Sequence, residues 1–204
     1  MIGCASSDPS SATVAVPPSS EATASSADPS TSSVPVTVGF TAPIVESVLI
    51  GFETAARIDG WATVNDPVMG GQSISSVAWR DAALVFSGEL SLENNGGFAS
   101  LVAPSDAVPA GAWVGRDGVR VVGSGDAKTY LLQLRSGDGS YVQRFVAGST
   151  FSVLLRFEDF VATSRFLDPL PDAEPLDPGD IIGLAIYILD KQVGPFELGL
   201  TSID

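Results

Sequence analysis

The chain has 204 residues, with 24 Asp and Glu against 10 Lys and Arg, so its formal net charge is −14. This balance argues against a nucleic-acid partner, because binding to phosphates needs a stripe of Lys and Arg, and here the cations are scattered singly. The sequence contains no His and one Cys. It therefore excludes Ser-His-Asp and Cys-His catalytic groups, His-containing zinc sites and any disulfide within the chain.

The first part of the chain differs in composition from the rest. Residues 1–45 are dominated by Ser, Thr, Ala and Pro and contain no Lys or Arg. Such a segment buries too little apolar surface to offset the entropy lost on ordering. We therefore predict a disordered tether over residues 1–45, followed by one domain over residues 46–204.

The tether begins Met1-Ile2-Gly3-Cys4 and continues with Ala and Ser. A small residue before a Cys, followed by Ser-rich sequence, is typical of the cleavage end of a bacterial lipoprotein signal, although the charged and apolar regions that precede such a Cys are missing here. We expect Cys4 to be lipidated and to hold the domain at a membrane surface of the cell envelope through that anchor alone. The alternative is a free Cys in a cytoplasmic tail.

From Val48 onward, short runs rich in apolar residues alternate with Gly, Pro, Asn and Asp, and no segment shows a sustained period of 3.6 residues. The predicted strands are Val48–Phe52, Ser73–Trp79, Ala83–Leu90, Gly118–Val122, Tyr130–Leu134, Tyr141–Val146, Phe151–Phe157, Ile181–Leu189 and Phe196–Ile203. We expect about ten strands in all, which predicts an all-β sandwich or jelly roll.

Three connections stand out in this pattern. Ser136–Ser140, with two glycines, predicts a hairpin. Asp168–Asp180 contains four prolines and predicts a long, stiff loop that crosses an edge or an end of the sandwich. Glu158–Phe160 is the one place where a single helical turn is expected.

Two segments combine a polar pair with two adjacent glycines. Trp61–Ser73 contains Asn65-Asp66 and Gly70-Gly71, and Leu92–Ser100 contains Asn94-Asn95-Gly96-Gly97. Adjacent glycines suit positions where φ is positive or where another part of the backbone comes close. Both segments are therefore predicted to be shaped loops at strand ends.

These segments also resemble a known family. The patterns W-x-x-V-N-D-x-V-M-G-G-x-S and F-S-G-x-x-S-L-E-N-N-G-G-F-A-S are similar to those of the complex I intermediate-associated protein 30 (CIA30) family. Further matches follow in order at Asp117–Arg120, Thr129–Arg135, Phe157–Phe160 and Asp190–Leu198. Pro67, Lys128 and Phe151 depart from the residues usual in the family, which are Gly, Arg and Trp.

The resemblance covers about Val48 to Ile203. It implies a galactose-binding-like β-sandwich. It also implies an assembly-factor or chaperone-like role, since the better-known members help to build respiratory complex I.

The polar pairs of the two loops have two interpretations. Asn65, Asp66, Asn94 and Asn95 suit hydrogen bonds to sugar hydroxyls or oxygen ligation of calcium. Alternatively, their side chains bond the local backbone and shape the turns, while the glycines supply positive φ. The spacing does not separate these alternatives.

The three tryptophans are candidates for a platform on which a sugar ring stacks. Trp61 lies at the entrance of the first loop and is taken as part of the candidate site. Trp79 lies inside an alternating strand and is predicted to be core. Trp113, between Pro109 and Gly115, is predicted to be exposed.

Three other motifs contain residues that could bind a ligand or take part in catalysis. Asp190-Lys191-Gln192 follows an apolar strand and is expected at the same surface as the two loops. Val121–Gly125 resembles the start of a dinucleotide-binding motif, but Lys128 stands at the third glycine position and no helix follows. Neighbouring acids such as Glu158 and Asp159 alternate faces or flank turns, which disfavours paired-carboxylate catalysis.

The sequence therefore predicts a non-enzymatic binding domain without a cofactor or a metal, whose partner is a protein, a carbohydrate or another small ligand. The candidate binding residues are Trp61, Asn65, Asp66, Met69, Gly70, Gly71, Asn94, Asn95, Gly96, Gly97, Asp190, Lys191 and Gln192.

Overall fold

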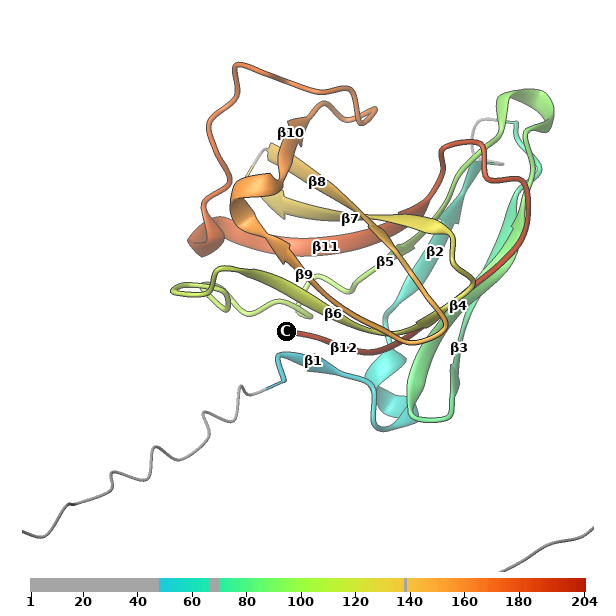
Figure 1. The fold of residues 1–204 in the computed structure, drawn as a ribbon, viewed down its shortest axis with the longest axis horizontal. Helices are drawn as coiled ribbons and strands as arrows, with labels where there is room; N and C mark the ends of the chain where they lie inside the picture. Colours follow the sequence, from blue (N-terminus) through green and yellow to red (C-terminus); the bar gives the residue numbers. More distant parts are fainter. Residues whose placement is uncertain (1–47, 67–69, 138) are drawn as a thin grey trace, which may run out of the picture. The chain divides into compact units, whose positions relative to one another are not determined.

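The computed structural model describes residues 48–66, 70–137 and 139–204, and Figure 1 shows the arrangement of their strands. Met69 and Cys4, which the sequence singles out, lie outside the described residues. The described part forms two antiparallel six-stranded sheets. The predicted all-β sandwich is confirmed.

The first sheet, sheet A, contains β1 (Ile50–Gly51), which pairs with β12. Its remaining strands follow the order β3 (Ile74–Arg80), β4 (Ala83–Leu90), β12 (Gly194–Ile203), β6 (Gly118–Gly125) and β9 (Phe151–Arg156). Sheet B has the order β10 (Val161–Thr163), β8 (Gly139–Val146), β7 (Thr129–Ser136), β11 (Ile181–Ile188), β5 (Ala99–Val102) and β2 (Ala62–Asn65).

The 3-10 turns that lie wholly within the described ranges have three or four residues each. These are η1 (Ala55–Ile58), η3 (Glu93–Asn95), η4 (Phe157–Asp159) and η5 (Pro178–Asp180). The predicted helical turn near Glu158 is therefore present, one residue earlier than expected. In the part of the chain that is described, no helix has the length and apolar character needed to span a membrane.

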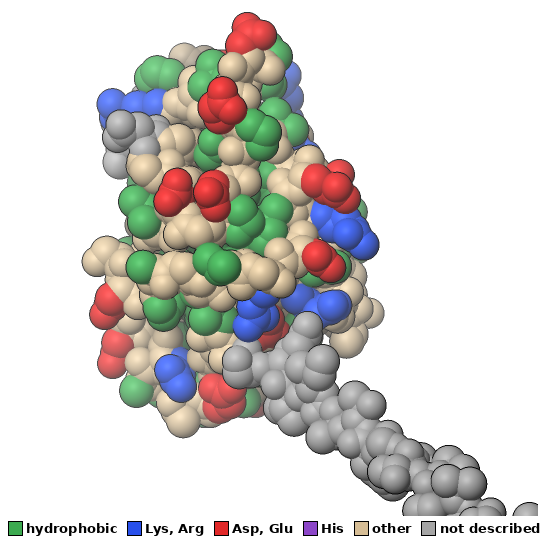
Figure 2. Space-filling model, turned by 90° about the vertical axis from the view of Figure 1, so that its left-hand side faces the viewer, with side chains coloured by type: hydrophobic (Ala, Val, Ile, Leu, Met, Phe, Trp, Pro, Cys, Tyr) green, Lys and Arg blue, Asp and Glu red, His purple; other side chains and the backbone are tan. Residues whose placement is uncertain are grey.

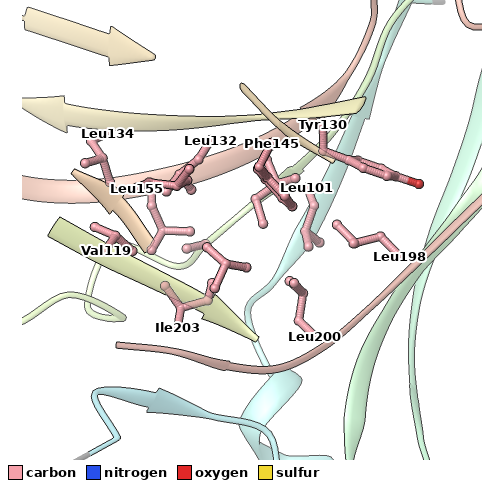
Figure 3. Packing of buried hydrophobic residues seen from close by; sticks show 14 of the residues in the cluster. Leu101, Val119, Tyr130, Leu132, Leu134, Phe145, Leu155, Leu198, Leu200 and Ile203 are labelled. Atoms are coloured by element: carbon pink, nitrogen blue, oxygen red, sulfur yellow. The ribbon is translucent and has the colours of Figure 1, made fainter. Parts of the chain in front are cut away.

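The core lies between the two sheets. Figure 3 shows side chains of sheet B, such as Leu132 and Phe145, pointing toward side chains of sheet A, such as Leu155 and Leu200. Alternate residues of each strand fill this layer, as a period of two requires. The burial of these large apolar side chains is the main stabilising contribution to the fold.

The central strands of sheet B are buried on both of their faces. In β7, Tyr130, Leu132 and Leu134 belong to the core cluster, and the residue between the first two, Leu131, is also only 2% exposed although it points to the other side. In β11, Ala185 on the outer face is likewise 2% exposed. The outer face of sheet B is therefore recessed along its middle strands, and this recess matters for the site described below.

Tight turns set the register of neighbouring strands. The predicted hairpin at Ser136–Ser140 is confirmed, because Ser136 pairs with Gly139 across the β7–β8 turn. In the β3–β4 hairpin, Arg80 pairs with Ala83, and both intervening residues, Asp81 and Ala82, have positive φ. This is the geometry that suits the twist of two-residue hairpins.

Strand β10 was not predicted from the sequence. It has three residues and forms the end of sheet B, where Leu170 N bonds Ala162 O at 2.8 Å and Thr163 bridges to Pro169. The predicted stiff loop over 168–180 thus begins by covering this edge. A strand this short is specified by its tertiary pairing and leaves no clear periodicity in the sequence.

Candidate functional site

The predicted loops meet at one end of the sandwich, at the upper right of Figure 1. Asn65 at the end of β2 pairs with Ala99 at the start of β5, and Ala99 also pairs with Ile188 at the end of β11. Gly194, which opens β12, pairs with Leu90, the last residue of β4. We call this end of the sandwich the rim; its described residues are 66, 70–73, 91–98 and 189–193.

Asp66 holds two of the rim loops together. Its side chain is fully buried. Oδ1 accepts a hydrogen bond from Ser73 N at 2.8 Å, and Oδ2 accepts from Ser73 Oγ at 2.5 Å. From the other loop, Gly97 N donates to Oδ2 at 2.6 Å and Phe98 N donates at 3.3 Å. One carboxylate therefore joins the loop that follows β2 to the loop that precedes β5.

The electrostatics of Asp66 agree with this structural role. Burial by itself raises the pKa of a carboxyl group, but the hydrogen bonds from Ser73, Gly97 and Phe98 outweigh it, so the pKa of Asp66 lies below its ordinary value of 3.8. The group is therefore ionised near neutral pH. Its described donors satisfy it from within the chain.

The double glycines allow the two loops to approach Asp66. A Cβ added to Gly71 would collide with Asp66 Cγ, and one added to Gly96 would lie 2.7 Å from Asp66 Oδ2. The other glycine of each pair provides a backbone conformation with positive φ, since Gly70 and Gly97 have φ of +93° and +134°. Each pair thus combines one glycine for close approach with one for positive φ.

The asparagines at the rim also have local structural roles. Asn94 and Asn95 are exposed and adopt positive φ of 54° and 61°, a conformation that Asn tolerates better than most residues. Asn65 lies just below the rim, where its Oδ1 accepts a hydrogen bond from Ser75 Oγ of β3. Of these three, Asn94 and Asn95 are the ones whose position leaves the amides facing solvent.

Gln192 attaches the third rim loop to sheet B. Its Nε2 donates to Thr129 O at 2.7 Å and to Leu189 O at 2.9 Å, while its Oε1 accepts from Thr129 N at 2.9 Å. Lys191 is exposed and has a φ of 60°. The sequence correctly places this loop next to the two glycine loops.

Asp190 forms the link between the rim and the outer face of sheet B. Arg144 Nε donates to its Oδ2 at 2.8 Å, and Arg144 Nη2 donates to its Oδ1 at 2.9 Å. This two-pronged hydrogen bond holds the pKa of Asp190 below its ordinary value, against the smaller opposing effect of burial. The pair fixes the guanidinium of Arg144 at one end of β8.

A second carboxylate that the sequence analysis missed supports the rim from sheet A. Asp126 accepts hydrogen bonds from Lys128 N and Glu197 N at 3.1 Å each, and from Tyr130 Oη at 3.2 Å. Burial raises its pKa, but the backbone hydrogen bonds from Lys128 and Glu197, together with the Lys128 ammonium group, outweigh burial, and the pKa lies below the ordinary value. The segment Val121–Gly125, which resembles a dinucleotide-binding motif, is therefore followed by a carboxylate with a structural role.

The tryptophans do not lie where the sequence places them. Trp61 is 7% exposed, packs edge to face on Phe52 at 5.4 Å and precedes β2, so it lies at the far end of that strand from the rim. The predictions for the other two were wrong. Trp113 is fully buried, because its Pro- and Gly-flanked segment folds into the core cluster, whereas Trp79 is 38% exposed on the edge strand β3.

A groove on the outer face of sheet B was not predicted. It has a volume of about 230 Å³. We call it the outer groove; it is lined by Leu131, Val142, Gln143, Arg144, Asp159, Val161, Thr163, Leu167 and Pro169. Leu131 and Val142 are 2% and 6% exposed and form an apolar floor, because they occupy the recess along the middle strands.

A row of hydrogen-bonded polar side chains leads across the same face to the outer groove. Tyr187 Oη of β11 donates to Gln133 Oε1 of β7 at 3.3 Å, and Gln133 Nε2 donates to Ser140 Oγ of β8 at 2.8 Å. Thr163 Oγ1 of β10 reaches Ser140 Oγ at 3.3 Å. We call these four residues the polar row. Burial raises the pKa of Tyr187, so its phenol stays protonated and able to donate.

A weak sequence signal for this face exists. Gln133 and Arg135 interrupt the apolar run of β7 at alternate positions, as Tyr187 does in β11. A polar residue on every second position of a central strand indicates a face that is open to a ligand or to solvent. Which face these residues share depends on the pairing register of the strands.

The site contains few groups for catalysis. Asp159 is the one carboxylate among the described residues of the outer groove, whereas glycoside hydrolysis uses two. No group of three or more acidic, Cys or His residues able to hold a metal ion occurs within residues 48–66, 70–137 and 139–204. Figure 2 shows Asp and Glu side chains spread over one whole face rather than gathered in one place.

Comparison with solved structures identifies the same fold in other proteins. The family 11 carbohydrate-binding module of the cellulase Lic26A-Cel5E of Clostridium thermocellum is 14% identical, with a TM-score of 0.50, over 76% of this chain and 93% of that module. The agarase AgWH50C is 11% identical, with a TM-score of 0.53, over 77% of this chain and 26% of that enzyme. At these identities the likeness establishes the galactose-binding-like sandwich.

None of the curated proteins compared with the chain matches it. The family model described as "Complex I intermediate-associated protein 30 (CIA30)" matches residues 50–200. This range includes both glycine loops, the four strands that carry the polar row and the Asp190–Gln192 loop. The match covers almost the whole of the sandwich, and the chain belongs to the CIA30 family.

Proposed function

We propose that this binding domain is non-catalytic and holds one residue of a carbohydrate chain in the outer groove. The observation that carries the proposal is the composition of the groove, where an apolar floor of Leu131 and Val142 lies beside Arg144, Asp159 and Thr163. A sugar ring has an apolar face of C–H groups and hydroxyls around its edge. It therefore matches a floor of apolar side chains bordered by donors and acceptors.

The size of the groove limits the ligand. Its volume of about 230 Å³ is below the roughly 300 Å³ at which ordinary small-molecule pockets begin. One ring, rather than a whole oligosaccharide, fits such a space. Further residues of a polysaccharide would follow the polar row from Thr163 toward Tyr187, whose hydroxyl and amide groups supply donors and acceptors along the outer face.

Support also comes from the fold. The module of the Clostridium thermocellum cellulase that shares it is described as carbohydrate-binding. The likeness concerns the fold, so the ligand assignment for this chain depends on the groove residues themselves.

The proposal is tested by titration calorimetry of the full chain with neutral polysaccharides such as mixed-linkage β-glucan and agarose. Asp159→Asn should weaken binding roughly tenfold, because a hydrogen bond to a charged group is lost. Asp172→Asn is the matched control, since Asp172 is exposed and lies outside the groove. No saturable binding by the wild type, or equal affinities for the two variants, would reject the proposal.

An assay for reducing sugar on the same mixtures examines the hydrolase alternative. Release of reducing sugar by the wild type that disappears in Asp159→Asn would show that the groove catalyses hydrolysis. A bound polysaccharide that stays intact is expected instead.

A second candidate function is an assembly-factor or chaperone-like interaction with a protein, as the family name implies. It is favoured by three exposed apolar side chains: Val161, which lines the outer groove, and Phe166 and Leu170, which follow it in the chain, are 48%, 76% and 46% exposed. Exposed aromatic and aliphatic groups grouped in this way are typical of protein interfaces.

Two variants separate the two functions. Phe166→Ser should reduce co-purification of membrane-complex subunits and leave polysaccharide binding unchanged, because Phe166 does not line the groove. Asp159→Asn should do the reverse. A protein partner captured equally by wild type and Phe166→Ser would argue against this second candidate.

For the location we propose a lipid anchor on Cys4 at the cell envelope. Mass spectrometry of protein extracted from membranes should find acyl mass on the peptide that contains Cys4. Recovery of the unmodified thiol in the soluble fraction would instead support a cytoplasmic protein.

A further inference from the structure

Sheet A ends at β9, which has β6 on one side and no strand of the described ranges on the other. Phe157 N bonds Asp117 O at 3.0 Å, and this bond fixes which residues face β6. In an antiparallel ladder the facing residues alternate. Phe151, Val153 and Leu155 therefore bond β6, while the backbone N–H and C=O groups of Ser152, Leu154 and Arg156 point away from the sheet.

The edges at β10 and at β2 and β3 are bonded to neighbouring segments. At the end of sheet B, Leu170 N bonds Ala162 O of β10. On the opposite side of the sandwich, β2 and β3 are joined by side chains, because Thr63 Oγ1 bonds Ser75 O and Ser75 Oγ bonds Asn65 Oδ1. Strands β1, β2 and β3 also have a partner strand on one side only, but β1 has two residues, and β2 and β3 carry the side-chain bonds named above. Among the described edge strands, β9 is thus the one of more than three residues without such a bond.

The residues of β9 do not protect this edge. Natural edge strands are usually blocked by Pro, by Lys, by a bulge or by being very short. The strand Phe151–Arg156 has six residues, contains neither Pro nor Lys, and pairs with β6 without a register shift. Leu154, in its centre, is 36% exposed.

We propose that a second copy of the chain pairs with β9, antiparallel, about a two-fold axis at Leu154. In this register Leu154 of one copy lies opposite Leu154 of the other, and Ser152 lies opposite Arg156. The strand is self-complementary, because its apolar centre meets an apolar centre and its one cation meets a hydroxyl. Such a contact is closed, as in most homodimers, and joins the two copies of sheet A into one continuous sheet.

Charge opposes association at long range but not at the seam. Each copy carries a net charge of −14, so two copies repel each other at long range. At the seam itself the balance differs, since β9 contains no carboxylate and Arg120 of β6 is the direct neighbour of Leu154. Because salt screens the long-range repulsion while the backbone hydrogen bonds remain, the dimer should become stronger as ionic strength rises.

The test is sedimentation of the full chain over a wide range of concentration, at low and at high salt. Leu154→Lys places like charges opposite each other and should raise the dimer dissociation constant at least about tenfold. Ile182→Lys is the matched control, because Ile182 is an exposed apolar residue of β11, outside the seam, and it should leave the constant unchanged.

A mixture of Leu154→Lys and Leu154→Glu should restore a dimer, which native mass spectrometry identifies as the mixed species by its mass. Both variants change an exposed side chain, and far-ultraviolet circular dichroism checks that they fold. A wild type that stays monomeric under all these conditions overturns the proposal. A dimer that persists in Leu154→Lys, or a mixture that yields no mixed species, overturns it as well.

Discussion

Polar side chains at the rim bond mostly to backbone groups, whereas those on the outer face of sheet B bond mostly to other side chains. At the rim, Asp66 and Gln192 accept and donate to backbone groups of neighbouring loops. On the outer face, the polar row bonds mainly side chain to side chain above a recessed apolar floor, with one longer bond from Thr163 Oγ1 to Ser140 O at 3.4 Å. A hydrogen bond to backbone holds a loop in shape, whereas side chains bonded mainly to one another can exchange those bonds for bonds to a ligand.

The most recognisable sequence motif of a domain need not form its ligand-binding site. The two glycine loops carry the family pattern because their geometry is demanding. Asp66 must reach into both loops, so one glycine in each must lack a Cβ. The outer groove has no comparable geometric demand, and its residues are individually unremarkable in the sequence.

The largest effect is expected for Asp66→Ala. This change leaves the N–H groups of Ser73 and Gly97 buried without their acceptor, which costs about 3 kcal/mol or more of unfolding free energy. Denaturant unfolding measures the loss. Asp59→Ala, at an exposed position, should change the free energy by less than about 0.5 kcal/mol. A loss at Asp66 no larger than this would show that the rim does not depend on the carboxylate.

A smaller effect distinguishes the two glycines of one loop. Gly71→Ala forces a Cβ against Asp66 and should cost about 2 to 3 kcal/mol, because a buried network must move. Gly70→Ala meets no atom within 4 Å and should cost only the strain of its positive φ, about 1 kcal/mol. Thermal unfolding of the two variants tests this order. A reversed order would mean that positive φ, rather than close approach, is what the loop requires.

The dependence of stability on pH follows from the lowered pKa of Asp66. A carboxyl group whose pKa is lower in the folded state than its ordinary value of 3.8 contributes stability that is fully present above that value. The contribution is lost as pH falls through the lower, folded-state pKa. Acid unfolding of the wild type should therefore be steep below this value. Asp66→Ala should show a shallower acid limb, and an unchanged limb would assign the acid sensitivity to other groups.

Much of the fold could be predicted, and the reasons are local. Strands such as β4 and β11 show their apolar runs directly, and adjacent glycines mark both rim loops. The sequence also predicts that loops far apart in the chain lie at one end of the sandwich, because antiparallel strands bring their connecting loops back to the same end. These features depend on short-range patterns that tertiary structure did not override.

The positions of the tryptophans and the outer groove could not be predicted from such local patterns. Trp113 lies among turn-forming residues, yet its segment folds inward and the ring becomes part of the core. Gln133, Ser140 and Thr163 come together only because β7, β8 and β10 pair in one register. No local pattern specifies that pairing, so neither the polar row nor the groove beside it could be derived from the sequence.

The smallest change in stability is expected for Asp190→Asn, a substitution that affects both the rim and the outer face of sheet B. Asp190 lies at the rim but bonds Arg144 of the outer groove. The pair is largely exposed, so its loss should cost only about 0.5 kcal/mol. Polysaccharide binding should nevertheless weaken, because the guanidinium of Arg144 is no longer held in place. Calorimetric titration and denaturant unfolding of this one variant measure both quantities. Unchanged affinity together with lowered stability would mean that Asp190 serves the rim alone.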